Sequence, residues 1–298
     1  MSIKLPKVAI IVLNWDGKKY LQDCLPKLIK TTYKNKEIFV VDNNSSDGSQ
    51  AYVKKFPKIH LIENKENLGW VGGNNIGIQN ALRLNPDAIM LLNNDITPTR
   101  SFIEPLVAAL FEKESVGIVG PILLVHNSKN RIADAGGIIK SKRFFAINRG
   151  CNLIMTKKYE KVTKVDYIIG AAMLIKRDVF KKIGLFNKDY FIYYDDTDFG
   201  VRARDAGFES YIIPQSKLFH RVSGTVKVGS PFHHYYTTRN HLLFMERNAP
   251  KKLMIRELIR MPKTVYEFIT SKDKVNKTYS LLGIRDYFLR RFGKRTYW

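Results

Sequence analysis

At 298 residues, the chain is long enough for one large domain or for a domain with an appendage. Hydrophobic residues make up 45% of it and aromatic residues 12%, which excludes a globally disordered protein. No apolar run reaches the roughly 18 residues of a membrane-spanning helix, so none is expected. The run Val8–Leu13 is too short for a signal peptide, and the distant Cys24 and Cys151 suggest no disulfide framework. We therefore expect a cytoplasmic protein.

The charge balance is strongly basic, with 50 Lys and Arg residues against 27 Asp and Glu residues and a net charge of +23. Such a surface suits anionic partners, namely nucleic acid, anionic lipid or a phosphorylated substrate; the alternative is a solvated surface without a partner. The excess continues to the C-terminus, where residues 250–298 hold 13 basic and 4 acidic residues, a net charge of +9.

Short β-branched runs alternate with helical segments in the first half of the chain, which predicts parallel strands joined by helical crossovers. We expect strands at Val8–Leu13, Ile38–Val41, His60–Ile62, Ala88–Leu92 and Val116–Val125, the last interrupted at Gly120-Pro121. We expect helices at Lys18–Thr31, Ser49–Phe56, Ile76–Leu84 and Ser101–Glu112. The first of these helices would bury one apolar face, made of Leu21, Leu25, Leu28 and Ile29.

The second half is less regular at first. Residues 126–164 hold ten basic residues and two acids, and we expect surface strands and loops that line an acceptor site. Order resumes at Tyr167–Ile175, followed by helices near Arg177–Ile183 and through Ala206, and by a strand at Tyr211–Ile213 that ends at Pro214. Helical periodicity returns from Tyr235 onward, with a break expected at Pro262.

Polar clusters follow three of the predicted parallel strands. They are Asn14-Trp15-Asp16-Gly17, the run from Asp42 to Gly48, and Asn93-Asn94-Asp95. Because parallel strands end at one edge of a sheet, and ligands of open α/β sheets bind at that edge, these side chains should share one crevice. A carboxylate there can accept hydrogen bonds from a nucleoside or bind a hard cation. This arrangement predicts an enzyme, although each cluster taken alone could be turn chemistry.

Three further features are candidates for chemistry. The glycine-rich segment 69–75 would form a loop that opens the helix starting at Ile76 and brings backbone amides close to a ligand; the alternative is packing. Asp195, Asp196 and Asp198 place three carboxylates within four residues, which suits a general base or a cation site, or an acid-rich helix start. His220 follows the strand at Tyr211–Ile213 after a short loop, as a ligand or a structural histidine.

The collinear order of these motifs, together with Gly170–Ile175, closely resembles glycosyltransferase family 2, most of all its rhamnosyltransferase-like branch, over about residues 7–247. The resemblance implies an α/β GT-A fold, with a mostly parallel central sheet flanked by helices. It implies an inverting transferase with a nucleotide-diphosphate sugar as donor, a divalent metal (Mg²⁺ or Mn²⁺) and a saccharide or lipid-linked acceptor. The products would belong to polysaccharide, glycan or glycolipid assembly.

Carried over residue by residue, the resemblance makes Asp196 the catalytic base and Asp95 and His220 the metal ligands. Asp42 would read the base of the nucleotide, and Arg239 would contact the diphosphate. The other donor-binding residues would be Asn14, Gly72, Gly73, Asn74, Asn94 and, again, Asp95. Asn93 and Asn94 stand where many relatives have a carboxylate, which leaves the metal fewer protein charges. The Q-x-x-R-W motif of processive synthases is absent, which implies the addition of one or a few sugars.

Two other functions compete with this interpretation. A sugar nucleotidyltransferase also uses a doubly wound sheet, but it usually has a glycine- and arginine-rich loop after its first strand, where this chain has Asn14-Trp15-Asp16-Gly17. A basic nucleic-acid-binding protein would fit the charge, yet the chain shows no nucleic-acid-binding motif and has acids at the predicted sheet edge.

We divide the chain into a catalytic domain over 1–247 and a basic, amphipathic helical tail over 248–298. The tail has two apolar stripes, one at Met254, Ile255, Leu258 and Ile259 and one at Leu281, Ile284 and Phe288, and it ends at Trp298. We expect the tail to attach the protein to the inner face of the cell membrane as a peripheral protein. The alternatives are packing on the catalytic domain and an oligomer interface.

Overall fold

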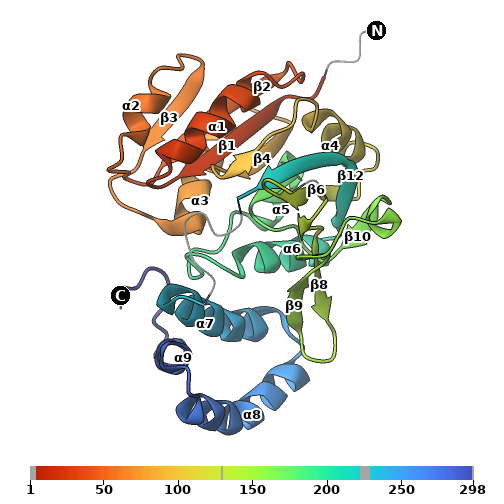
Figure 1. The fold of residues 1–298 in the computed structure, drawn as a ribbon. Coiled ribbons are helices and arrows are strands. Elements are labelled where there is room, and N and C mark those ends of the chain that lie inside the picture. The colour runs from red at the N-terminus through yellow and green to blue at the C-terminus, as the bar shows by residue number, and fades with distance from the viewer. Residues whose placement is uncertain (1–4, 129, 222–228, 297–298) are drawn as a thin grey trace.

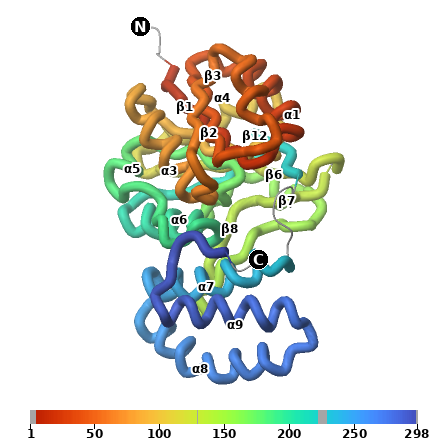
Figure 2. The backbone as a smooth tube through the Cα atoms, turned by 90° about the vertical axis from the view of Figure 1, so that its left-hand side faces the viewer, coloured from red at the N-terminus to blue at the C-terminus, as the bar shows by residue number. Residues whose placement is uncertain are grey.

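The computed structural model describes residues 5–128, 130–221 and 229–296. A large mixed sheet with helices on both faces forms the upper part of the molecule, and helices α7, α8 and α9 form a separate layer below it (Figures 1 and 2). The strands of the large sheet follow the order β10-β12-β6-β11-β4-β1-β2-β3, with β5 on β12 and β7 on β6. Their bounds are β1 Val8–Asn14, β2 Lys36–Asp42, β3 Ile59–Glu63, β4 Ala88–Asn93, β5 Ile96–Thr97, β6 Val116–Val125, β7 Ile132–Asp134, β10 Thr163–Val165, β11 Ala172–Lys176 and β12 Glu209–His220.

Helices flank this sheet, and a hairpin of two short strands extends from it. The helices of the upper part are α1 Lys18–Ile29, α2 Ser49–Val53, α3 Gly69–Leu82, α4 Ile103–Leu110, α5 Arg177–Ile183 and α6 Asp195–Asp205. The hairpin consists of β8 Gly137–Lys140 and β9 Phe145–Asn148, and a 3₁₀ turn lies at Lys157–Tyr159. The lower layer consists of α7 Pro231–Asn248, α8 Lys251–Thr270 and α9 Lys274–Phe288.

The parallel part of the sheet matches the sequence pattern. Strands β1, β2, β3 and β4 run parallel, and β1 is buried because it lies between β2 and β4, with Val8–Val12 inaccessible to solvent. Helix α1 covers one face through Leu21, Leu25 and Leu28. Ile29 was wrongly placed on this face: it lies at the end of the helix and is 40% exposed.

The other half of the sheet differs from the prediction. Strand β11 is antiparallel and lies between β4 and β6. Strand β6 continues through Gly120-Pro121 without a break. Strand β12 runs on through Pro214 to His220, because a shift in its register against β6 between Ile213 and Lys217 accommodates the proline, which has no N–H to donate. His220 therefore ends a strand rather than following a loop.

Two helices also differ from the prediction. Helix α3 begins at Gly69, so most of the expected glycine loop forms its first two turns. Helix α8 continues through Pro262, whose side chain is exposed on the outer side of the helix, where water can satisfy the carbonyl that loses its partner.

The helical layer is anchored to the sheet by α7. Leu242, Leu243, Phe244 and Met245 of α7 are buried, and Phe244 stacks on Phe144 of the β8–β9 hairpin. Helix α9 packs along α7, and α8 covers both from below (Figure 2). Within the described ranges, no helix is long and apolar enough to cross a membrane.

Candidate active site

The ends of the three parallel strands are joined by hydrogen bonds between their polar side chains. Asn94 Nδ2 donates to Asn14 Oδ1 at 2.6 Å, and Asn14 Nδ2 donates to Asp42 Oδ2 at 2.8 Å. All three residues are buried. Gly17 completes the arrangement, since a Cβ at this position would lie 2.0 Å from Asn94 Nδ2. The predicted shared edge therefore exists, and it brings together residues 14, 42 and 94.

Asp42 is enclosed by hydrogen-bond donors of the protein, which limits direct contact with a nucleobase. It is 1% exposed and also accepts hydrogen bonds from the N–H and hydroxyl of Ser45 and from Gln50 Nε2. Its carboxylate thus has protein donors on both oxygens. A nucleobase could reach it only if one of these donors moved.

Asp95 and His220 come together at the junction of β5 and β12. Strand pairing aligns His220 with Ile96, and its Nε2 lies 3.4 Å from Asp95 Oδ1. This oxygen is buried and accepts no hydrogen bond, which leaves it available to a cation. Over the ranges that the structure describes, no group of three or more His, Cys, Asp or Glu side chains could hold a metal. The unpartnered Asp95 oxygen beside the His220 imidazole could give a divalent ion two ligands, and a diphosphate and water would have to supply the others.

The acid cluster opens helix α6 and contains two carboxyls of different environment. Asp195 is 4% exposed, whereas Asp196 is half-buried. Asp196 accepts hydrogen bonds from the N–H groups of Gly170 at 3.0 Å and Thr197 at 2.7 Å. Burial raises the pKa of both carboxyls, and the charge of Asp196 raises the pKa of Asp195 further. The N–H groups of Gly170 and Thr197 oppose this rise at Asp196, so the protein supports the charged form of Asp196 with hydrogen bonds.

Trp70 connects the acid cluster to the strand ends. Its indole N–H donates to Asn93 Oδ1 at 3.1 Å, and a Cβ on Gly170 would lie 2.4 Å from its ring. Gly170 in turn donates to Asp196. The first turn of α3 thus connects the end of β4 to the acid cluster.

The glycine segment has mainly a packing role. A Cβ on Gly73 would lie 2.4 Å from Leu13 Cδ1, and Asn74 is 1% exposed with its amide donating to the Trp70 carbonyl. Gly72 is partly exposed, although a Cβ there would meet Leu68 at 2.6 Å. Of Gly72, Gly73 and Asn74, all expected at the donor, only Gly72 is accessible in this structure.

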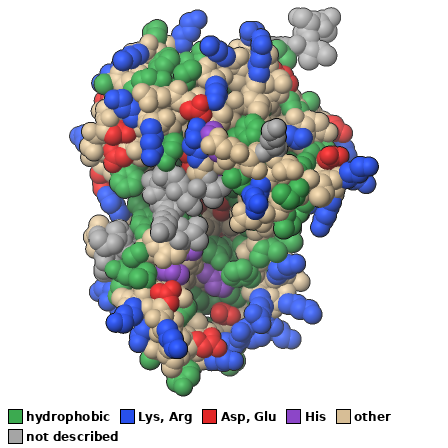
Figure 3. All heavy atoms as spheres, viewed as in Figure 1, with side chains coloured by type: hydrophobic (Ala, Val, Ile, Leu, Met, Phe, Trp, Pro, Cys, Tyr) green, Lys and Arg blue, Asp and Glu red, His purple; other side chains and the backbone are tan. Residues whose placement is uncertain are grey.

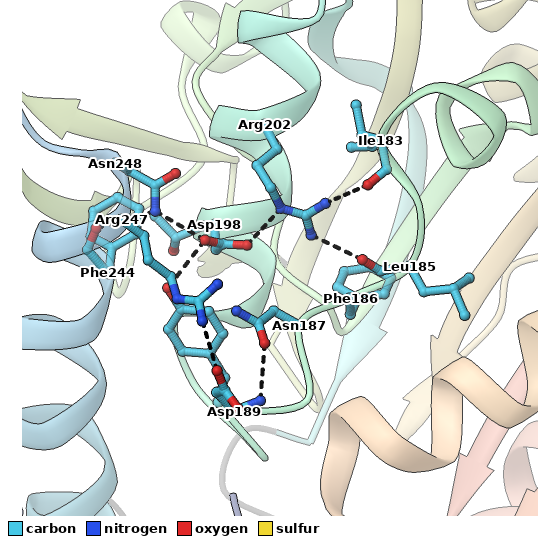
Figure 4. Close-up of polar contacts among 12 residues, drawn as sticks. Ile183, Leu185, Phe186, Asn187, Asp189, Asp198, Arg202, Phe244, Arg247 and Asn248 are labelled. Atoms are coloured by element: carbon cyan, nitrogen blue, oxygen red, sulfur yellow. Dashed lines mark hydrogen bonds and ion pairs between the residues drawn. The ribbon is translucent and has the colours of Figure 1, made fainter. Parts of the chain in front are cut away.

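Asp198, the third acid of the cluster, is structural (Figure 4). Its carboxylate, 2% exposed, accepts hydrogen bonds from Arg202 Nε at 2.8 Å and from Asn248 Nδ2 at 2.9 Å. Arg202 also donates to the carbonyls of Ile183 and Leu185. Asp198 therefore ties α6 to α5 and to the end of α7.

Arg239 was expected at the diphosphate, and the structure contradicts this prediction. The residue is fully buried in α7, with its guanidinium 4.8 Å from the Tyr236 ring centroid. Its five N–H groups face protein acceptors, including the carbonyls of Asp189, Tyr190 and Gly293. No donor remains for a diphosphate, so Arg239 is a structural residue.

The segment before the acid cluster has a strained backbone that α7 holds in place. Phe191, Tyr193 and Tyr194 have φ values of 65°, 64° and 65°, which residues other than glycine rarely adopt. Asn240 Nδ2 lies 2.9, 2.7 and 3.0 Å from the carbonyl oxygens of Tyr190, Ile192 and Tyr193. Arg239 and Asn240 therefore act as positioning residues for the segment that carries Asp195 and Asp196.

Asp134, at the end of β7, is an acid of this site that sequence reasoning did not single out. It is 2% exposed; Oδ1 accepts the Gly136 N–H at 2.7 Å, and Oδ2 has no partner. Burial raises the pKa of Asp134 to about 7; the Gly136 N–H opposes the rise, and the Asp196 charge adds to it. The signal in the sequence was an isolated acid before Gly136-Gly137 in a basic segment.

Known proteins similar to this chain point to one family. Residues 8–184, more than half of the chain, match the family described as Glycosyl transferase family 2. The dTDP-rhamnosyl transferase RfbF of Shigella flexneri is 25% identical over 256 residues, which cover 80% of this chain and 81% of RfbF. The N-acetylglucosaminyl-diphospho-decaprenol L-rhamnosyltransferase of Mycobacterium tuberculosis is 25% identical over 238 residues, 74% of this chain and 76% of that protein.

Solved structures share the fold. The mannosyltransferase PcManGT from Pyrobaculum calidifontis, in complex with GDP-Man and Mn²⁺, aligns with a TM-score of 0.58 at 14% identity, over 97% of this chain and 89% of that one. GalNAc-T7, with UDP, GalNAc and Mn²⁺, aligns with a TM-score of 0.63 at 16% identity, over 82% of this chain but 48% of its own. The fold is GT-A, as expected.

These findings confirm the predicted resemblance, and they set aside the nucleotidyltransferase and the nucleic-acid-binding protein as alternatives. With its GT-A fold and a match over more than half of its length, the chain belongs to glycosyltransferase family 2.

Proposed function

We propose that this glycosyltransferase is a metal-dependent, inverting hexosyl- or rhamnosyltransferase. It moves a sugar from a nucleotide-diphosphate donor to an acceptor hydroxyl. The observation that carries the proposal is the arrangement at the sheet edge: a half-buried carboxylate, Asp196, is connected through Gly170 and Trp70 to the strand end that precedes Asp95. The two relatives named above are rhamnosyltransferases by name, which supports rhamnose or another hexose as the sugar.

Asp196 is the proposed general base. It accepts the proton of the acceptor hydroxyl while the hydroxyl oxygen bonds to the anomeric carbon. On the opposite face of the sugar, the bond from that carbon to the diphosphate breaks, and the diphosphate leaves with the bonding electrons. The hydrogen bonds from the N–H groups of Gly170 and Thr197 stabilise the carboxylate form of Asp196 that this step needs. One displacement inverts the anomeric centre without a covalent sugar–enzyme intermediate.

Asp95 and His220 are proposed to lie beside the diphosphate, which is the leaving group. Their free carboxylate oxygen and imidazole are a suitable ligand set for Mg²⁺ or Mn²⁺. A divalent ion bound there would supply the positive charge that stabilises the departing diphosphate. Asn94 and Asn14 fix the relative positions of these strand ends, since their hydrogen bonds join the end of β4 to the ends of β1 and β2.

The acceptor is proposed to be lipid-linked, with the enzyme attached peripherally to an anionic membrane surface. The apolar stripe of α8 supports this proposal, because Ile255 is 57% and Ile259 is 74% exposed among basic residues. In the stripe of α9, Ile284 is buried and serves packing, whereas Phe288 is 53% exposed; Trp298 lies outside the described residues. One relative's name includes a decaprenol-linked acceptor.

The proposed function is tested by measuring hydrolysis of a panel of UDP-, GDP- and dTDP-sugars, with and without chelator. Hydrolysis of one donor that stops in chelator and resumes with Mn²⁺ is expected. If the full-length protein hydrolysed none of the panel under any of these conditions, the proposed donor chemistry would be wrong.

A further inference from the structure

A cavity of about 450 Å³ lies where the helical layer of α7, α8 and α9 meets the upper part of the molecule. It is lined from α7, α8 and α9, from Tyr194 before the acid cluster, and from Phe145 of β9. Its volume falls within the range of roughly 300–1,000 Å³ found for small-molecule sites. In Figure 3, histidine side chains (purple) gather in this region, between the upper part of the molecule and the helices at the bottom. The mechanism above makes no use of this cavity.

One end of the cavity adjoins the proposed base. Tyr194 lines the cavity and directly precedes Asp195. Its ring lies 5.6 Å from that of His241, which lines the cavity too. Burial and the charge of Asp196 both raise the pKa of Tyr194. The cavity therefore ends at a residue two positions before Asp196.

The lining favours an apolar ligand. Phe145, Leu242, Met261 and Phe268 contribute side chains without polar groups able to form strong hydrogen bonds. Burial lowers the pKa of His241 to about 4, so its ring is neutral near pH 7. Among the described lining residues, Glu257 alone belongs to the charged types Asp, Glu, Lys and Arg. A charged sugar phosphate would lose its hydration here without gaining a partner of opposite charge.

Helix α8 connects the cavity with a surface suited to lipid. Its inner side lines the cavity through Met261, Thr264 and Phe268. Its outer side exposes Ile259 by 74% and Tyr266 by 67%, beside several lysines and arginines. Interleaved apolar and basic side chains are the chemistry that recognises an anionic lipid surface. The wall of the cavity is thus also the part of the molecule best suited to touch a membrane.

We propose that this cavity binds the apolar chain of an amphiphilic acceptor. The part of the chain that lies in the cavity is the part nearest to the acceptor sugar. The sugar then projects past Tyr194 toward Asp196, and the far end of the chain remains in the lipid beside α8. The inference rests on the proposed function, which it deepens by naming the place where the lipid part of the acceptor binds.

The test uses n-decyl β-glucoside below its critical micelle concentration, with methyl β-glucoside as the probe without a chain. Calorimetry should detect binding of the decyl compound to the full-length protein and none of the methyl compound. Thr264→Phe, which fills the cavity from α8, should weaken binding by at least about tenfold. Thr264→Val, which replaces the hydroxyl by a methyl group without filling the cavity, should leave it unchanged.

Thr270 provides a matched control on the same helix. Thr264 and Thr270 each donate a hydroxyl hydrogen bond to the carbonyl four residues earlier, but Thr270 is exposed and lies outside the cavity. Thr270→Phe should bind the decyl probe like the wild type. Equal binding by Thr264→Phe and Thr270→Phe, or equal affinity for the two glucosides, would overturn the proposal.

A second measurement needs no variant. A decyl glucoside with a diazirine at the end of its chain should crosslink to cavity residues of α7 and α8 in the wild-type protein; crosslinks confined to other surfaces contradict the proposal. Donor hydrolysis without acceptor separates this inference from the proposed function. Chain binding without hydrolysis of any donor would reject the function alone, and hydrolysis without chain binding would reject the cavity alone.

Discussion

The side-chain amide of Asn240 donates to the main-chain carbonyl of Tyr193 at 3.0 Å, and so connects helix α7 to the segment that carries the proposed base. The same nitrogen reaches two further carbonyls of this segment, in which three residues have positive φ. A strained backbone persists only where its surroundings determine it. The helical layer thus contributes to the geometry of the active site.

Asn240→Ala tests this positioning role. The change leaves buried carbonyls without a donor, at a cost of about 1–3 kcal/mol, and lets the segment before Asp195 relax. We expect transfer to fall by at least about tenfold, with little change in affinity for the nucleoside diphosphate. Asn80→Ala is the control, because Asn80 donates to the Ile76 carbonyl within α3. Equal activity in the two variants would contradict the role.

The acids of the cluster should separate into a catalytic and a structural residue. Asp196→Asn should reduce transfer by at least about 10²-fold while donor binding and thermal stability remain near wild type. Asp198→Asn should instead lower stability by about 3 kcal/mol, because it breaks a buried ion pair with Arg202. Steady-state kinetics and denaturant unfolding of both variants check this. Near-normal turnover of Asp196→Asn would remove it from the role and make Asp195 the next candidate.

Metal dependence has its own prediction. Chelator should abolish transfer, and Mg²⁺ or Mn²⁺ should restore it. Asp95→Ala and His220→Ala should each weaken Mn²⁺-dependent binding of the nucleoside diphosphate by about tenfold or more, because each removes one of two protein ligands. The measurement is calorimetric titration with and without Mn²⁺. Full activity of the wild type in chelator would rule out the metal-dependent mechanism.

The buried Asp134 predicts a pH dependence of stability. Its pKa is raised from 3.8 to about 7 in the folded protein, so folding favours its protonated form. This stabilisation is present below about pH 4 and is lost as the pH rises through 7. Compared with Asp134→Asn, the wild type should lose up to about 4 kcal/mol between these limits. Denaturant unfolding at several pH values in chelator measures this; parallel pH curves for the two proteins would contradict the shift.

Attachment to membranes is best tested on α8. Removal of residues after Asn248 would also remove α9, which packs on α7, so a point variant is cleaner. Ile259→Glu should reduce co-sedimentation with anionic vesicles several-fold, and high salt should reduce binding of the wild type, since each basic residue near such a surface contributes about 1 kcal/mol. Phe288→Glu, 53% exposed on α9, should have a smaller effect. Equal losses would mean that α8 is not the contact.

The sequence was informative where periodicity and strand ends determine structure. The run that became β1 and the polar residues Asn14, Asp42 and Asn94 allowed both the parallel sheet and its shared edge to be predicted. Local signals were misleading where tertiary contacts decide. The register shift in β12 accommodates Pro214. The glycines at the start of α3 lie inside the helix, where Phe191 packs against Gly69 and Leu13 packs against Gly73.

Side-chain roles were hardest to predict for buried polar residues. Nothing local distinguishes an arginine that meets a diphosphate from Arg239, whose partners come from residues about 50 positions away on either side. Asp134 stood in an irregular basic segment, and only the three-dimensional structure brings it within electrostatic reach of Asp196.

The insertion of β11 between β4 and β6 makes the centre of the sheet depend on residues that are synthesised late. Strands β1 to β4 lie within the first hundred residues, so the Asn14–Asp42–Asn94 edge can form while the rest of the chain is still on the ribosome. The centre of the sheet cannot be completed until β11 and β12 are synthesised, because β11 lies between β4 and β6, and β12 pairs with β6. Half of the active site thus comes from the first hundred residues, and Asp95 can meet His220 only after more than two-thirds of the chain has been synthesised.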